Sequence, residues 1–516
     1  MLLFRNNCHF YNSILIPKTE RLTAAHVHKK PLCKPLRFGR LRLASTPVKS
    51  AFGRHRVIAR LRAALLSCAM ASFLIGCAVL PDVRYLNSTL TPAEKITVEG
   101  ANGALSAKRA KSLVAKQLRS TRLNLQDLAT LEEAATGRPL IAGNKVTLLF
   151  DGPQTMAVML EAIETAKDHI NLETYIFDQD ELGLLFADAL IAKQRAGVQV
   201  NIIYDSVGTI GTPAEFFTRM RDAGIQLVEF NPVNPLKRFD KWRINNRDHR
   251  KILVVDGRVA FTGGINITAD YAESSLFRAK NPPRDETEVG WRDTHIRVEG
   301  PAVAAIQFLF LDVWTRQTNR ELQDRNYFPQ PVRAGDKLLR VLGSEPGGDF
   351  EIYKAYILAI QEAKRSIHIS SPYFAPDAQV VRALQEAAQR GVDVKIIFPS
   401  ITDSGLIFHA GRSYYKTLLK SGIRIYELQV AVLHAKTAVI DGVWSTVGSA
   451  NLDMRSFLHN NEINVVVLGE DFGRSMESAF NEDLRNSVEI SLEEWRRRPL
   501  IDRIKEWSAR RFGYWL

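Results

Sequence analysis

The chain has 516 residues, enough for more than one hydrophobic core, and its 46% hydrophobic and 24% charged residues exclude a disordered or fibrous protein. Its net charge of +13 lies in residues 1–62, which hold 14 of the 69 basic and one of the 56 acidic residues, so the neutral remainder gives no support to nucleic-acid binding. All four cysteines precede residue 78, which excludes disulfides, thiolate metal sites and a cysteine nucleophile from the rest of the chain.

The basic leader, residues 1–62, is followed by an uncharged apolar run, residues 63–80. A cationic flank, a short apolar stretch and a small residue before a cysteine are typical of a bacterial export signal. Leu74-Ile75-Gly76-Cys77 resembles the lipobox of bacterial lipoproteins, in which Cys77 is lipidated and becomes the new N-terminus, so the leader would be absent from the mature protein. Alternatively, residues 63–80 remain as an uncleaved anchor of barely sufficient length. Both versions attach the protein to a membrane of the bacterial cell envelope, with its globular part on the periplasmic side.

Residues 81–140 are predicted to form a tether and a helical lead-in, after which one unit occurs twice. The amphipathic segment Leu160–Ile170 is echoed by Ile357–Ile367, and each leads into an apolar strand. Further β-branched strands follow in both copies: Val198–Tyr204 and Gly224–Phe230 in the first, Val392–Phe398 and Gly422–Leu428 in the second. The pattern predicts an α/β fold with two homologous domains, about 141–330 and 335–490, each a mixed, largely parallel sheet flanked by helices, followed by a tail, 491–516.

Each copy closes with the spacing His-x-Lys-x4-Asp, formed by His249, Lys251 and Asp256 in the first copy and by His434, Lys436 and Asp441 in the second. On a strand, the histidine and the lysine point to the same face, so a nucleophile or proton carrier lies beside a cation, which suits a phosphate ester. A single match could be a histidine and a lysine that merely border a core strand. Two matches at equivalent repeat positions, each followed by a glycine-containing turn that ends in Asn266 or Asn451, favour a duplicated catalytic motif.

This doubled motif resembles the signature of the phospholipase D superfamily, and the resemblance covers about residues 140–490. It implies two halves related by a pseudo-two-fold axis, with the active site between them. It also implies a two-step phosphoryl transfer: one histidine attacks phosphorus to give a phosphohistidine, and the other protonates the leaving alkoxide and then deprotonates the incoming alcohol or water. An imidazole titrates near neutral pH and can serve as both acid and base.

By the family pattern, His249 is expected to be the nucleophile and His434 the acid and base, although spacing alone does not order them. The resemblance implies that the non-bridging oxygens are held by Lys251, Lys436, Asn266 and Asn451. Asp256 and Asp441 are grouped with these catalytic residues, but each is expected to support the structure or orient its histidine rather than to attack phosphorus.

Two more acids occupy equivalent positions, because Asp293 and Glu462 each stand seven residues before a glycine. In family terms, such carboxylates accept the second N–H of a catalytic histidine and fix its tautomer. The alternative is a surface acid at the start of a strand. No metal-binding or nucleotide-binding motif is present, and the lysines can neutralise the phosphate, so no metal or other cofactor is expected.

Within the superfamily, several segments resemble bacterial cardiolipin synthases: Leu172–Phe177, Asn246–Lys251, Trp291–His295, Ala450–Ser456 and Ser491–Trp495. The implied reaction joins two molecules of phosphatidylglycerol, an anionic phospholipid, into cardiolipin and glycerol. Hydrolysis to phosphatidic acid by a phospholipase D and cleavage of nucleic acid by a nuclease stay open, the latter disfavoured by the neutral charge. Members of this family usually carry two transmembrane helices before the catalytic part, whereas this chain has one apolar segment. The oligomeric state is not indicated.

The tail, residues 491–516, interleaves basic and aromatic residues. Leu500, Ile504, Trp507, Arg511 and Trp515 fall near helical spacing and predict one largely apolar face flanked by arginines. Such a helix can lie in the interface of an anionic membrane surface. The alternative is an ordinary terminal helix that packs its apolar face on the body.

Overall fold

The computed structural model describes residues 79–91, 96–117, 125–237, 243–272 and 290–515. Residues 80–516 belong to one compact unit. The basic leader and Cys77 lie outside the described residues, so the predictions on the signal and on lipidation stay predictions. Within the described ranges, no helix is long and apolar enough to cross a bilayer.

The first sheet has the strand order β6-β5-β4-β8-β9-β11-β3. Its strands are β3 (Leu140–Leu149), β4 (His169–Thr174), β5 (Gln199–Asp205), β6 (Gln226–Phe230), β8 (Ile252–Val255), β9 (Val259–Gly263) and β11 (His295–Glu299). Strands β4, β5 and β6 are parallel to one another, and every other neighbouring pair is antiparallel. The sheet is therefore mixed, with its parallel part at one side.

The second sheet repeats this order as β16-β15-β13-β18-β19-β21-β12. Its strands are β12 (Lys337–Ser344), β13 (Ser366–Ser370), β15 (Asp393–Pro399), β16 (Arg424–Leu428), β18 (Thr437–Ile440), β19 (Trp444–Gly448) and β21 (Asn460–Leu468), and β22 (Ser487–Glu489) adds an antiparallel edge to β16. The two sheets join where β3 pairs antiparallel with β12. Identical strand order about an antiparallel junction gives the two halves their pseudo-two-fold relation.

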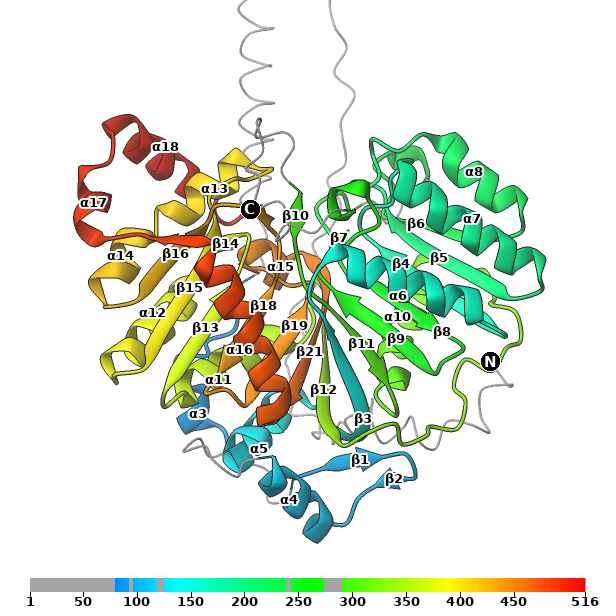
Figure 1. Ribbon diagram of the computed structural model, residues 1–516, viewed down its shortest axis with the longest axis horizontal. Coiled ribbons are helices and arrows are strands. Elements are labelled where there is room, and N and C mark those ends of the chain that lie inside the picture. Colours follow the sequence, from blue (N-terminus) through cyan, green and yellow to red (C-terminus); the bar gives the residue numbers. More distant parts are fainter. Residues whose placement is uncertain (1–78, 92–95, 118–124, 238–242, 273–289, 516) are drawn as a thin grey trace, which may run out of the picture. The chain divides into compact units, whose positions relative to one another are not determined.

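Helices cover both faces of each sheet. The first sheet carries α6 (Gly152–Thr165), α7 (Glu181–Arg195), α8 (Ala214–Asp222) and α10 (Val303–Gln317), and the second carries α11 (Glu351–Glu362), α12 (Ala378–Gln389), α13 (Gly405–Arg412), α14 (Tyr415–Lys420) and α16 (Glu470–Arg485) (Figure 1). Side chains of β8 alternate between the layers: Leu253 and Val255 join the cluster of α6 and α7, whereas Ile252 and Val254 join that of α10. Burial on both faces explains why these strands read as continuous apolar runs.

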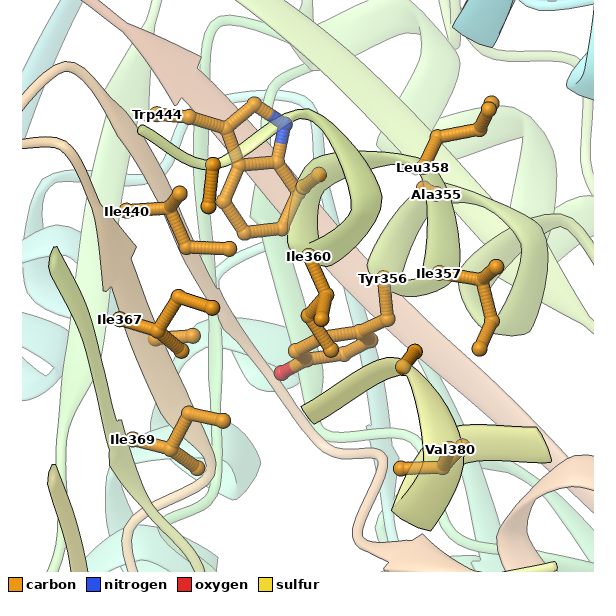
Figure 2. Packing of buried hydrophobic residues seen from close by; sticks show 14 of the residues in the cluster. Ala355, Tyr356, Ile357, Leu358, Ile360, Ile367, Ile369, Val380, Ile440 and Trp444 are labelled. Carbon is orange, nitrogen blue, oxygen red and sulfur yellow. The ribbon is translucent and has the colours of Figure 1, made fainter. Parts of the chain in front are cut away.

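The second half has a dense apolar core between α11 and its sheet. Figure 2 shows Tyr356 and Ile360 of α11 directed toward Ile367 and Ile369 of β13. A separate cluster contains residues of both halves, including Val298 of β11 and Val465 of β21. Because this cluster is shared, the halves are held together by apolar packing as well as by the β3–β12 junction.

The lead-in before the first repeat is more than a tether. It contains α3 (Leu86–Thr89), β1 (Val98–Gly100), β2 (Gly103–Ala104), α4 (Ala107–Lys116) and α5 (Leu125–Thr136), and β1 pairs parallel with β3. Glu132 of α5 is buried in the second half, where it accepts a hydrogen bond from Trp444 Nε1 at 2.7 Å and pairs with the buried Arg340. Since breaking a buried ion pair costs about 3–5 kcal/mol, α5 is an integral part of this half.

Asp256 and Asp441, the aspartates of the two motifs, lie in the hairpin connections of the first and second halves. Each occupies, with the following glycine, the first two positions of the three-residue connection of a β-hairpin, with φ of 53° at both aspartates. A turn of this kind requires positive φ, which aspartate and glycine tolerate best. The carboxylate of Asp256 accepts backbone N–H groups of residues 167–169, and that of Asp441 accepts those of residues 364–366. Both aspartates thus tie the motif hairpin to the strand beside it.

We predict that Asp441→Ala lowers stability and spares chemistry. The change removes the acceptor of three N–H groups at 2.7–2.9 Å, and each one left without a partner costs roughly 1–3 kcal/mol. Asp441→Asn retains one acceptor oxygen and tolerates positive φ, so its loss should be smaller. Chemical denaturation measures the stability, and turnover per folded molecule measures the chemistry. A well-folded Asp441→Asn protein without turnover would contradict this structural role.

Candidate active site

Each motif histidine follows a short strand that is hydrogen-bonded to the opposite half. Strand β7 (Arg247–Asp248) pairs parallel with β21, and the N–H of His249 donates to the carbonyl of Asn461 at 3.0 Å. Strand β10 (Trp291–Arg292) pairs parallel with β17 (Val432–Leu433), and the N–H of His434 donates to the carbonyl of Arg292 at 2.8 Å. These reciprocal pairings bring both motifs to the seam between the halves, where β7 and β10 lie in Figure 1.

Asp293 and Glu462, the two acids at equivalent repeat positions, each contact the motif histidine of the opposite half. Glu462 of the second half lies 3.1 Å, through both carboxylate oxygens, from Nδ1 of His249. Asp293 of the first half lies 2.7 Å from Nδ1 of His434. Both acids are fully buried, so neither is a surface acid. A carboxylate that accepts Nδ1–H leaves Nε2 of each ring as the nitrogen available to a substrate.

The lysines lie beside their histidines. Lys251 Nζ donates to the carbonyl of His249 at 2.7 Å, and Lys436 Nζ donates to that of His434. Both lysines are 2% exposed, and both histidines are buried. The site therefore concentrates positive charge where little solvent compensates it, which favours an anionic ligand such as a phosphodiester.

The electrostatics link the two motifs into one centre. Burial, opposed by Glu462 and reinforced by Lys251, lowers the pKa of His249 to about 4, and Lys436 of the other half adds to the decrease. Burial and then Lys436 lower the pKa of His434 well below its ordinary value, with contributions from Lys251 and His249. A charge of one half can shift a pKa in the other half only when the two groups are close together. In the free site both imidazoles are therefore neutral at physiological pH.

The lysine side chains are also perturbed. Burial lowers the pKa of Lys251 to about 7, and the Lys436 ammonium contributes to the decrease. Burial lowers the pKa of Lys436 to about 8, against the attraction of Asp293 and Glu462. Both ammonium groups therefore lose their protons near neutral pH. A bound anion stabilises their charged forms, because its negative charge replaces the solvation that burial removes.

The two carboxylates differ in ionisation. Burial by itself would raise the pKa of Glu462, but His249 and Lys251 outweigh it and hold this pKa below its usual value. Ser449 Oγ and Asn460 Nδ2 also donate hydrogen bonds to Glu462. For Asp293, burial prevails over Lys436 and raises the pKa. The His249–Glu462 pair is therefore the more strongly polarised of the two.

The turn after each motif contributes to this difference. At the position of Ser449, the first repeat has Gly264, and a Cβ added there would meet the Asp293 carboxylate at 2.2 Å. Glycine thus admits the carboxylate of Asp293, whereas serine supplies a hydroxyl donor to Glu462. The repeats combine a glycine with an aspartate in one half and a serine with the longer glutamate in the other.

The predicted substrate-binding asparagines lie in the same region and are buried. Asn266 Oδ1 accepts the backbone N–H of Ile176 at 3.2 Å, and its side chain also hydrogen-bonds the hydroxyl of Tyr271. Asn451 donates its backbone N–H to Ser456 Oγ at 3.1 Å, and its Oδ1 has no hydrogen-bond partner among the described residues. Contact of either amide with a phosphate stays a prediction.

Aromatic residues that sequence reasoning did not assign to the site line it. The rings of Tyr175 and His249 pack edge to face with their centres 5.1 Å apart, and those of Tyr373 and His434 do so with their centres 6.2 Å apart. Trp291 packs on His434 at 4.7 Å, and the Tyr271 hydroxyl lies 3.0 Å from its Nδ1. Tyr175 and Trp291 belong to segments already quoted for their family resemblance, whereas Tyr271 follows Asn266 by five residues without a counterpart in the second repeat.

Comparison with known proteins decides the family. A family model described as "Cardiolipin synthase, PLD-like domain" matches residues 159–276 and 356–484. A cardiolipin synthase from Alkalihalophilus pseudofirmus is 34% identical over 403 residues, 78% of each chain. The major cardiolipin synthase ClsA of Bacillus subtilis is 38% identical over 372 residues, which cover 71% of this chain and 74% of that protein. The chain belongs to the cardiolipin synthase family.

The family places this chain among phospholipase D-type phosphatidyltransferases, whose substrates are phospholipids such as phosphatidylglycerol. The crystal structure of a phosphatidylserine synthase from Haemophilus influenzae Rd KW20 has the same fold, with a TM-score of 0.55. It is 14% identical and covers 72% of this chain and 95% of its own, so this likeness concerns the fold alone. The predicted α/β fold of two phospholipase D-like halves is confirmed. Among the described residues, no group of three or more His, Cys, Asp or Glu side chains is arranged to hold a metal ion.

We predict that the two lysines shape the alkaline limb of the dependence of kcat/KM on pH. A phosphodiester needs both ammonium groups charged, so the decline of kcat/KM with rising pH should steepen above about 7 and again above about 8, the pKa values of Lys251 and Lys436. In its predicted role as nucleophile, His249 must be neutral, so the acid limb should lie near pH 4 rather than 6.5. Steady-state rates between pH 3.5 and 10 on vesicles of constant composition measure the profile.

The matched variant is Lys251→Arg, which keeps its charge across this range and should move the onset of the alkaline fall toward the pKa of Lys436. A wild-type profile that stays flat to pH 10 would contradict the involvement of these lysines.

Proposed function

We propose that this phosphatidyltransferase converts two phosphatidylglycerols into cardiolipin and glycerol through a phosphohistidine at His249. The observation that carries the proposal is the exchange of carboxylates across the seam, Glu462 to His249 and Asp293 to His434, beside two buried lysines. Two imidazoles with fixed tautomers are what a double displacement at phosphorus requires: one to attack and one to move the proton.

In the first step, Nε2 of His249 attacks phosphorus while Lys251 and Lys436 neutralise the non-bridging oxygens. A nitrogen–phosphorus bond forms, the bond from phosphorus to the glycerol headgroup breaks, and the leaving alkoxide takes a proton from Nε2 of His434. His434 must be protonated for this. In the free site, burial and then the charge of Lys436 lower the pKa of His434. A bound phosphate offsets the charge of Lys436 and so raises this pKa, which allows His434 to be protonated.

In the second step, a terminal hydroxyl of another phosphatidylglycerol gives its proton to His434 and attacks phosphorus, and the bond to His249 breaks. Cardiolipin leaves and the site returns to its initial state. The aromatic side chains Tyr175, Trp291 and Tyr373 support an alcohol over water as acceptor, since they occupy space around both imidazoles with mainly apolar surface.

The assignment of His249 as nucleophile is supported by the state of its partner. A phosphohistidine that keeps Nδ1–H carries positive charge on its ring, which an ionised Glu462 with two further donors stabilises. At His434, the raised pKa of Asp293 and the Tyr271 hydroxyl near Nδ1 suit a ring that repeatedly gains and loses a proton.

We also propose that Cys77 is lipidated and attaches the protein to the periplasmic side of a membrane in the cell envelope. The support is the sequence that precedes it, a basic leader and an apolar run that ends in Leu74-Ile75-Gly76. Intact mass of the protein extracted from bacterial membranes should correspond to a chain that begins at Cys77 with attached acyl groups. A mass that includes residues 63–76 would favour the uncleaved anchor.

Incubation of the purified full chain with phosphatidylglycerol vesicles tests the reaction, with lipid products identified by mass spectrometry. Cardiolipin and glycerol in equal amounts are expected, and phosphatidic acid as the main product would show hydrolysis instead. His249→Ala and His434→Ala should each reduce turnover by about 10²–10⁴-fold with unchanged circular dichroism. Acid quenching during turnover should trap phosphatidyl on His249, and a label on His434 would reverse the two roles.

A further inference from the structure

The C-terminal helix turns its apolar face away from the protein. Helix α18 (Leu500–Arg510) packs on α13 through its other side, where Glu506 and Ala509 are buried and Glu506 pairs with Arg498. Leu500, Ile501, Ile504 and Trp507 are 67%, 58%, 50% and 62% exposed. An ordinary terminal helix buries its apolar stripe, whereas α18 packs on α13 through another side and leaves this stripe exposed.

The exposed stripe has apolar neighbours. Leu406 of α13 is 46% exposed, and Phe512, two residues beyond α18, is 52% exposed. Together with the stripe they form a set of six side chains that we name the apolar platform: Leu406, Leu500, Ile501, Ile504, Trp507 and Phe512. Large apolar side chains gathered on adjoining elements mark an interaction surface rather than ordinary scattered exposure.

The charges around the apolar platform are mainly basic. The exposed charged side chains of α18 and its end are Arg503, Lys505, Arg510 and Arg511, whereas Asp502 is half-buried and Glu506 is paired. The Arg511 guanidinium lies 4.7 Å from the ring centre of Trp507. An apolar face bordered by arginine, lysine and tryptophan matches the boundary between the headgroups and acyl chains of an anionic bilayer.

The apolar platform is connected to the active site. Helix α13 packs on β14 (Phe374–Ala375), which pairs with β20 (Leu452–Asp453) directly after Asn451. Beyond α18, the carbonyl of Trp515 accepts a hydrogen bond from Arg455, which also donates to Asn245 in the segment that leads into His249. Figure 1 shows α13 and α18 at the upper side of the view, where β10 also lies, with β14 below α13.

We propose that the apolar platform is a docking surface for an anionic lipid bilayer, separate from the N-terminal attachment. Docking there would hold the edge that carries the active site against the layer in which its lipid substrate resides. The inference rests on the proposed function in one respect, the choice of phosphatidylglycerol as substrate. Exposure of the stripe, basic charge and connection to the site point to the same occupant.

The test compares two substrate forms with the full chain. The triple variant Leu500→Ser/Ile504→Ser/Trp507→Ser should raise KM for phosphatidylglycerol vesicles about tenfold or more, since binding scales with buried apolar area. It should leave kcat/KM unchanged for monomeric short-chain phosphatidylglycerol, which needs no docking. The matched control, Leu185→Ser/Val332→Ser/Val488→Ser, removes apolar side chains of similar exposure elsewhere and should leave both activities unchanged.

A second measurement does not depend on activity. Brominated phosphatidylglycerol in the vesicles should quench tryptophan fluorescence of the wild type, and Trp507→Phe should remove a large part of that quenching. Quenching without any cardiolipin formation would leave docking intact and reject the proposed reaction. Equal vesicle KM values for the platform triple variant and its control would overturn the docking proposal. The docking proposal would also be overturned if the wild type sedimented as a dimer and the platform triple variant as a monomer that keeps its activity on vesicles. The apolar platform would then join two copies of the chain.

Discussion

The structure depends on an exchange between its halves: each motif histidine is held by a buried carboxylate from the opposite half. Glu462 reaches His249 and Asp293 reaches His434, and short parallel strand pairs beside them fix the approach. Neither half alone contains a complete histidine–carboxylate pair. The duplicated fold is therefore functional only when both sheets meet along β3 and β12 and share an apolar core.

The same burial that fixes these pairs creates an electrostatic deficit. Two lysines and two histidines are withdrawn from water with two carboxylates, and burial lowers the pKa values of Lys251 and Lys436 to about 7 and 8. A phosphodiester supplies negative charge that replaces part of the solvation lost by the two ammonium groups. Substrate binding and the protonation of His434 are thereby coupled, because the anion weakens the repulsion that disfavours the imidazolium. The unliganded site therefore favours binding of an anion over binding of water.

A repeated motif need not give two equivalent histidines. Ser449 donates to Glu462, whereas Gly264 only makes room for Asp293, and this adds to the effect of His249 and Lys251, which lower the pKa of Glu462. In the proposed mechanism, such small differences between the repeats separate the histidine that carries phosphorus from the one that exchanges protons. The motif aspartates, by contrast, are equivalent: both form hairpin turns and both bind backbone N–H groups.

The sequence by itself determined the two-fold repeat, the α/β class and the motif residues, because strand periodicity and a spacing that occurs twice are local properties of the chain. It also singled out Asp293 and Glu462, but not that each serves the histidine of the other half. Only the tertiary structure decided this crossing, the backbone groups that Asp256 and Asp441 bind, the place of Tyr271 at His434, and the outward apolar face of α18. These features depend on which elements pack together although they lie 75 to 213 residues apart in the chain, and no local pattern encodes that.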